Sequence, residues 1–94
     1  MFHQAALTDA DDAAAYYSGR VPQLGEAFIA ELMRIVVLAT EGPELGFRMR
    51  AGRRRWHFSR FPFTMVYRVA PDGSLRVLAF AHHKRRPGFW RSRI

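Results

Sequence analysis

Histidine and arginine side chains supply most of the groups in this chain that could take part in chemistry. His82 and His83 come directly before a basic run, Lys84 to Arg86. Because an imidazole titrates near neutrality, His82 could act as a general base in RNA cleavage, with Arg60 and Arg85 as the accompanying basic residues. The alternative, which we favour, is that His82 hydrogen-bonds locally and fixes the chain that follows it.

A metal or cofactor site is not expected. The chain has no cysteine. His82 and His83 are neighbours in a predicted strand, so their side chains point to opposite faces, and no nearby carboxylate completes a set of zinc ligands. The sequence also lacks a glycine-rich phosphate loop and a nucleophile elbow.

Arginines concentrate at the start of the predicted sheet. Guanidinium groups bind phosphates and carboxylates through paired, charge-assisted hydrogen bonds, so this group is predicted to contact a partner. The alternative is a solvated turn and edge strand. Strand neighbours alternate in direction, so Arg53 and Arg55 cannot share a face with Arg54. The group consists of Arg48, Arg50, Arg53, Arg54 and Arg55.

A second basic group surrounds aromatic residues in the last twelve residues. This combination suits a nucleic acid, through phosphate contacts and stacking, and equally a protein interface, where Trp and Arg are enriched. The alternative is that Trp90 folds back onto the core while the charges are solvated, and for Trp90 both interpretations stay open. The candidate contacts here are Arg85, Arg86, Trp90 and Arg93.

Charge divides the chain into two halves. Residues 1–45 hold two basic residues and seven acids, a formal charge of −5, whereas residues 46–94 hold thirteen basic residues and one acid, a formal charge of +12. This asymmetry predicts an acidic partner or nucleic acid for the second half, although a basic surface that only serves solubility is the alternative. The acids of the first half are expected on its solvent-facing or partner-facing side.

Two helices are predicted before residue 45, in a single domain over residues 1–94. The first spans about Asp9–Ser18, with Thr8 and Asp11 as a capping box, and a short, irregular strand is predicted before it at Phe2–Ala6. The second begins at Pro22 and stops at Gly42–Pro43. Its apolar positions recur at helical spacing, and the short connection predicts an antiparallel helical hairpin.

Three strands are predicted in the second half, with a weak edge strand at Gly46–Arg50. Their ranges are Arg53–Phe61, Phe63–Val69 and Leu75–His82. In the last of them every second residue from Leu75 should face the same side. The fold class is therefore α+β, a helical hairpin packed on an antiparallel sheet of three to four strands, with the other sheet face free for a partner.

Several local features together resemble one protein family. They are Tyr16-Tyr17 at the end of an acidic helix, Arg60-Phe61-Pro62-Phe63 before a strand, and a tail with the pattern His82-x2-Arg85-x-Pro87-x2-Trp90-x2-Arg93. Their order along nearly the whole chain is similar to the RelE/ParE toxins of type II toxin–antitoxin systems, especially the ParE-like branch.

The resemblance implies a toxin that a cognate antitoxin neutralises. ParE-like toxins poison DNA gyrase, whereas RelE-like toxins are endonucleases that cleave mRNA on the ribosome. The family's ribonucleases tend to carry a late tyrosine or a late base such as glutamate or histidine, but here the last tyrosine is Tyr67, inside a predicted strand, and this favours gyrase. An inactive or general nucleic-acid-binding module is the remaining alternative.

The resemblance also suggests where to look for partners. Antitoxins of this family wrap the toxin, so we expect an exposed apolar groove beside the helices. A toxin dimer within the assembly is possible. No signal peptide and no transmembrane stretch are predicted, so the expected compartment is the cytoplasm.

Overall fold

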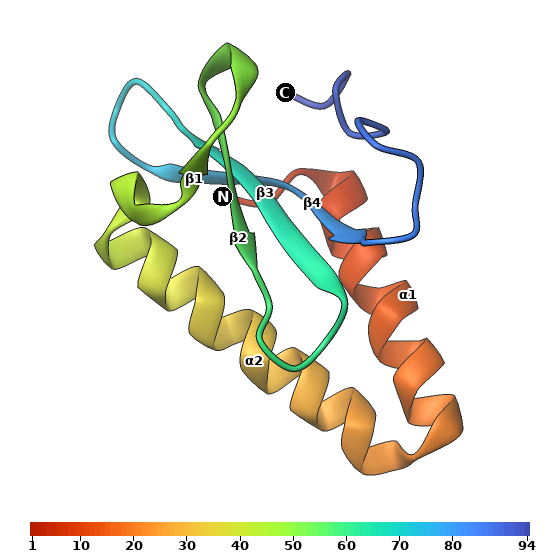
Figure 1. Ribbon diagram of the computed structural model, residues 1–94. Coiled ribbons are helices and arrows are strands. Elements are labelled where there is room, and N and C mark those ends of the chain that lie inside the picture. Colours follow the sequence, from red (N-terminus) through yellow and green to blue (C-terminus); the bar gives the residue numbers. More distant parts are fainter.

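The computed structural model describes residues 1–94 and places two helices against one face of a four-stranded antiparallel sheet (Figure 1). The strand order is β1-β2-β3-β4, each strand pairing with the next along the chain. The α+β class and the helical hairpin on an antiparallel sheet are therefore confirmed. The elements are α1 (Gln4–Arg20), α2 (Pro22–Glu41), β1 (Phe47–Arg48), β2 (Arg53–His57), β3 (Phe63–Val69) and β4 (Leu75–His82).

Helix α2 has the bounds that the sequence predicts. Pro22 lies in its first turn, and the backbone N–H of Gly42 donates to Leu38 O at its end. Its apolar face supplies Phe28 to the core, where the ring stacks on Phe58 at a centroid distance of 5.3 Å. At Gly25 the two helices approach closely, since a Cβ there would lie only 2.9 Å from Ala14 O.

Helix α1 begins earlier than predicted. His3 caps it, because its Nδ1 accepts from the N–H of Ala5 at 3.0 Å, and the helix runs from Gln4. The predicted capping box at Thr8 is wrong, since Thr8 lies inside the helix and its hydroxyl donates to Gln4 O. The good helix formers that follow Gln4 extend the helix toward the N-terminus once His3 satisfies a free N–H.

The predicted strand Phe2–Ala6 is reduced to one parallel bridge. Only Phe2 pairs, with Val77, where His3 N–H donates to Val77 O at 2.8 Å and Val77 N–H donates to Met1 O at 2.7 Å. These bonds satisfy part of the outer edge of β4, which would otherwise be an open sheet edge.

Strand β2 ends at His57 rather than at the predicted Phe61. From Phe58 the chain turns into a loop whose apolar side chains point inward: Phe58 and Phe61 are both buried. Their rings surround Phe28, and the aromatic packing replaces the ladder that a longer strand would have formed.

Strand β4 contains a β-bulge that the alternation pattern does not predict. Val66 pairs with Ala79, but the next residue, Tyr67, pairs with Val77, which leaves Leu78 as the extra residue. Consequently Phe80 lies in the same core cluster as Val77, whereas strict alternation assigns them to opposite faces.

The outer face of the sheet, away from the helices, is not free as predicted. Phe89 and Trp90 of the C-terminal tail (residues 83–94) pack against a small cluster formed by Val66, Leu78 and Ala79. Neither α1 nor α2 combines the length and the hydrophobicity that a membrane-spanning helix needs.

Candidate functional site

The C-terminal tail is held in place by the carboxylate of Asp9, which lies in α1 and is 9% exposed. Its Oδ2 accepts from Arg93 at 2.7 Å and from the backbone N–H of Phe80 at 3.1 Å. Arg85 lies 3.4 Å from the other oxygen, and Arg93 donates also to Leu78 O at 3.0 Å. The bulge, the helix and the tail thus meet at one buried charge.

Aromatic stacking shapes the tail above this anchor. Two guanidinium groups lie close to the ring of Phe89, with the Cζ of Arg85 3.6 Å and the Cζ of Arg93 5.1 Å from its centroid. Trp90 lies on the outer sheet face, where the Cζ of Arg53 is 5.3 Å from the centroid of its ring. The same guanidinium group donates to Arg91 O at 2.7 Å. Cation–π contacts and buried aromatic area together give the tail a defined shape without regular secondary structure.

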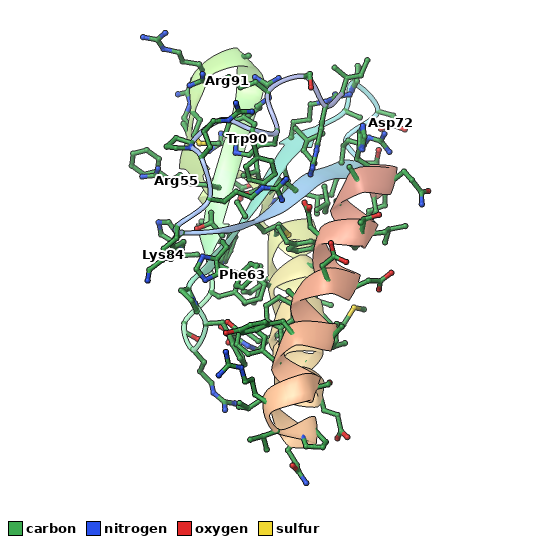
Figure 2. All side chains as sticks on the ribbon, turned by 90° about the vertical axis from the view of Figure 1, so that its right-hand side faces the viewer. Arg55, Phe63, Asp72, Lys84, Trp90 and Arg91 are labelled. Atoms are coloured by element: carbon green, nitrogen blue, oxygen red, sulfur yellow. The ribbon has the colours of Figure 1, made fainter.

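The predicted tail contacts therefore fall into two groups. Arg85, Arg93 and Trp90 make intramolecular contacts that hold the tail. Arg86 is exposed and its side chain makes no hydrogen bond or ion pair within the chain, and the same holds for the side chain of Lys84. In Figure 2, Arg55, Lys84 and Trp90 lie on the side of the sheet away from the helices, whereas Phe63 lies on the helix side.

The arginines near β2 divide by face, as the alternation predicts. Arg54 donates to Glu44 O and to Gly46 O on one side. Arg53 and Arg55 lie on the outer face, where the Cζ of Arg55 is 4.3 Å from the centroid of the Phe47 ring. The remaining two members of the group, both exposed and without a side-chain hydrogen bond, are Arg48 and Arg50.

The structure brings together only two of the three residues predicted for RNA cleavage. His82 and Arg85 line a pocket of about 210 Å³ between α1 and β4. Arg60 lines a different pocket, beside Glu31. His82 accepts from the N–H of Lys84 at 3.0 Å, which is the local hydrogen bond that we favour from the sequence.

The last tyrosine in the chain is fully buried. The hydroxyl of Tyr67 donates to Pro43 O at 2.7 Å, and burial raises its pKa. A Cβ at Gly46 would overlap this phenol, so the close approach requires glycine there. Tyr67 thus joins the connection after α2 to the sheet and does not reach a substrate.

A second buried carboxylate, Glu31 of α2, organises the loop between β2 and β3. It is 5% exposed and accepts from the hydroxyl of Ser59 at 2.8 Å, from the N–H of Ser59, and from the N–H of Arg60 at 3.2 Å. Burial raises the pKa of this carboxyl, but these hydrogen bonds and the nearby Arg34 outweigh burial and hold the pKa below its ordinary value of 4.5.

Sequence reasoning missed Asp9 and Glu31, because acids in an amphipathic helix were expected to face solvent or a partner. That expectation is wrong for these two of the seven acids. It also missed a cluster on the outer face, in which Thr64 joins His57 and His83. No spacing rule connects these residues, since the strand pairing alone brings them together.

Replacing Asp9 by Asn is expected to destabilise the protein by about 3 kcal/mol, because Arg93 then keeps a largely buried charge without a counter-ion. Urea unfolding measures the loss, and amide hydrogen exchange in residues 83–94 should rise. Asp11→Asn, at an exposed position of the same helix, is the matched control. Equal stability of the two variants would refute the anchoring role.

The Glu31 carboxylate predicts a specific acid sensitivity. Because its folded pKa is lowered, its stabilising effect is complete above pH 4.5 and is lost as the pH falls through the folded value. Urea unfolding between pH 6 and pH 3 should therefore show a steeper loss for the wild type than for Glu31→Gln. Glu26→Gln, exposed on the same helix, should follow the wild-type curve, and parallel curves for all three proteins would contradict the assignment.

Comparison with known protein families identifies the family of this chain. Residues 1–87 match the profile of a family described as ParE toxin of type II toxin-antitoxin system, parDE. The match covers both helices, all four strands and the tail as far as Pro87. Among curated proteins none matches significantly.

Proposed function

Because the chain belongs to the ParE toxin family of type II toxin–antitoxin systems, we propose that it arrests growth by binding and poisoning DNA gyrase. Family membership carries this proposal and also implies a cognate antitoxin as partner. The tail supports it, because the buried anchor at Asp9 holds a basic, aromatic segment in one shape before any partner binds. A preorganised segment loses less entropy on binding than a mobile one.

Exposed tail arginines are the expected gyrase contacts. Arg86 and Arg91 are both exposed, whereas Arg85 and Arg93 already hold the tail. Binding to gyrase blocks supercoiling or traps cleaved DNA, and the toxin needs no catalytic residue of its own for this effect. The proposal thus agrees with Arg60 lying in a different pocket from His82 and Arg85.

A gyrase assay tests the proposal. Purified toxin should block supercoiling or trap cleaved DNA, and the double variant Arg86→Ala/Arg91→Ala should need about tenfold more protein for the same effect. Arg20→Ala, at the far end of α1, should inhibit like the wild type. A folded protein that arrests growth in cells but leaves gyrase unaffected would refute the proposal and redirect attention to mRNA cleavage.

We further propose that the antitoxin docks on the helical side of the molecule. A groove of about 470 Å³ lies between α1 and α2, as expected from the sequence, and beside it Ile29, Met33 and Val37 form an exposed apolar stripe on α2. Met33 and Val37 are more than half exposed, which is unusual for apolar side chains in line on one helix. An amphipathic antitoxin helix would bury both the groove and the stripe. The groove is lined by Ala14, Ser18, Gly25, Glu26, Ile29 and Ala30.

Met33→Arg should preserve the fold, since the side chain is exposed, and should weaken antitoxin binding at least tenfold by placing a charge in the apolar stripe. The variant should therefore remain toxic when the antitoxin is co-expressed. Ser92→Arg adds the same charge to the tail and should still be neutralised. Full neutralisation of Met33→Arg would exclude the stripe as the docking site.

A further inference from the structure

The outer sheet face carries like charges in register. Arg53 of β2 pairs directly with Arg68 of β3, which pairs with Arg76 of β4. Like charges on directly opposite strand positions repel each other, so this row destabilises the sheet unless an anion neutralises it. All three ion pairs of the molecule involve Asp9 or Glu31, and none involves this row.

Backbone carbonyls of the tail compensate the row only in part. Arg53 donates to Arg91 O at 2.7 Å, and Arg76 donates to Ile94 O at 3.0 Å. The Arg91 carbonyl has a dipole but no net charge, and a negative charge on the α-carboxyl group of Ile94 would offset only one of the three guanidinium charges, so the row keeps a net positive charge. Next to the row, Arg55 keeps a buried Nε without any hydrogen-bond acceptor.

A second group of potential hydrogen-bond donors lies at the other end of the same face. The hydroxyl of Thr64, in a side chain that is 7% exposed, lies 2.6 Å from Nδ1 of His57 and 2.9 Å from Nε2 of His83. The second nitrogen of each imidazole has no partner within the chain, and both histidines are exposed. Thr64 and His83 also line a pocket of about 200 Å³ beneath the tail, together with Arg85 and Arg86 and with no acidic residue.

We propose that this outer face binds the sugar–phosphate backbone of a single nucleic-acid strand. The His57–Thr64–His83 cluster holds one phosphate, and the arginine row holds others. Four residues along β2 separate the two groups, about 13 Å, a distance that a few nucleotides span. Binding here does not require gyrase, so its test is independent of the proposed function.

The donors favour phosphodiesters over an acidic protein segment. The two non-bridging oxygens of a phosphodiester project from a tetrahedral phosphorus, so the imidazoles of His57 and His83 and the guanidinium groups of the pocket can donate to them from different directions, whereas both oxygens of a carboxylate lie in one plane. The row of arginines on successive strands suits the regular charge of a backbone.

Protonation of His57 should couple to binding. Burial lowers the pKa of His57 most, and the nearby Arg55 and His83 lower it further. This ring is therefore neutral in the free protein near pH 7. The charged or titratable groups facing it are Arg55 on its own strand and His83 across Thr64, with Arg85 and Arg86 further along the pocket. Since a phosphate favours the protonated ring, affinity should rise as the pH falls from 8 to 6.

Fluorescence anisotropy with a labelled 12-nucleotide single-stranded DNA, in 50 mM salt at pH 6 and pH 8, tests the proposal. We expect binding that weakens with added salt, and an affinity loss of about tenfold at pH 6 for His57→Gln/His83→Gln that becomes small at pH 8. Arg68→Gln should weaken binding at both pH values, whereas Arg20→Gln, outside this face, should not.

Three outcomes would overturn the proposal: no binding by the folded wild type in 50 mM salt, an equal loss for Arg20→Gln, or stronger binding of a glutamate-rich peptide of the same length. The last outcome would assign the face to an acidic protein. Circular dichroism and thermal unfolding of each variant confirm that a loss of binding is not a loss of fold.

Discussion

The carboxylate of Asp9 is the interaction on which the rest of the structure depends. It joins three segments that are distant in the sequence: α1, the bulge of β4 and the end of the tail. The N–H of Phe80 and the carbonyl of Leu78 lie at or near the bulge of β4, and Asp9 and Arg93 satisfy them. A buried charge without these donors would cost several kcal/mol, so helix, bulge and tail stabilise one another or fail together.

Glu31 has the corresponding role in α2. Its carboxylate accepts from the backbone of Ser59 and Arg60 and so fixes the loop between β2 and β3 on the helix. Both buried acids therefore join the helical layer to the sheet layer through backbone N–H groups. Such bonds are specific in direction, whereas apolar packing alone would tolerate several arrangements of loop and tail.

The use of acids on the helical side leaves the arginine row of the outer sheet face without an acidic side chain as partner. Arginines that stack on Phe89 and Trp90 or bind backbone carbonyls stay charged, because neither kind of contact neutralises a guanidinium group. The molecule thus presents two different surfaces, an apolar helical side with exposed Met33 and Val37 and a basic sheet side. Such a division suits a toxin that must meet an antitoxin and a target.

The sequence by itself determined the elements of regular periodicity and the charge asymmetry. Pro22, the apolar stripe that includes Phe28, and Gly42 define α2, since helix start, face and stop are local properties. Strands β3 and β4 follow from their flanking turn and alternation, and the motifs around Arg60 and Trp90 pointed to the family. Helix α1 was placed too late because the cap by His3 leaves little signal in the pattern of residue types.

Only the tertiary structure decided which charged residues are structural. Asp9 and Asp11 are indistinguishable in sequence, yet the helix rotates one toward the β4 edge and leaves the other in water. The bulge at Leu78, the arginine row and the approach of His57 to His83 all depend on strand register, which long-range pairing sets. A pattern of local spacing contains no information about that register, because each contact joins residues from different strands.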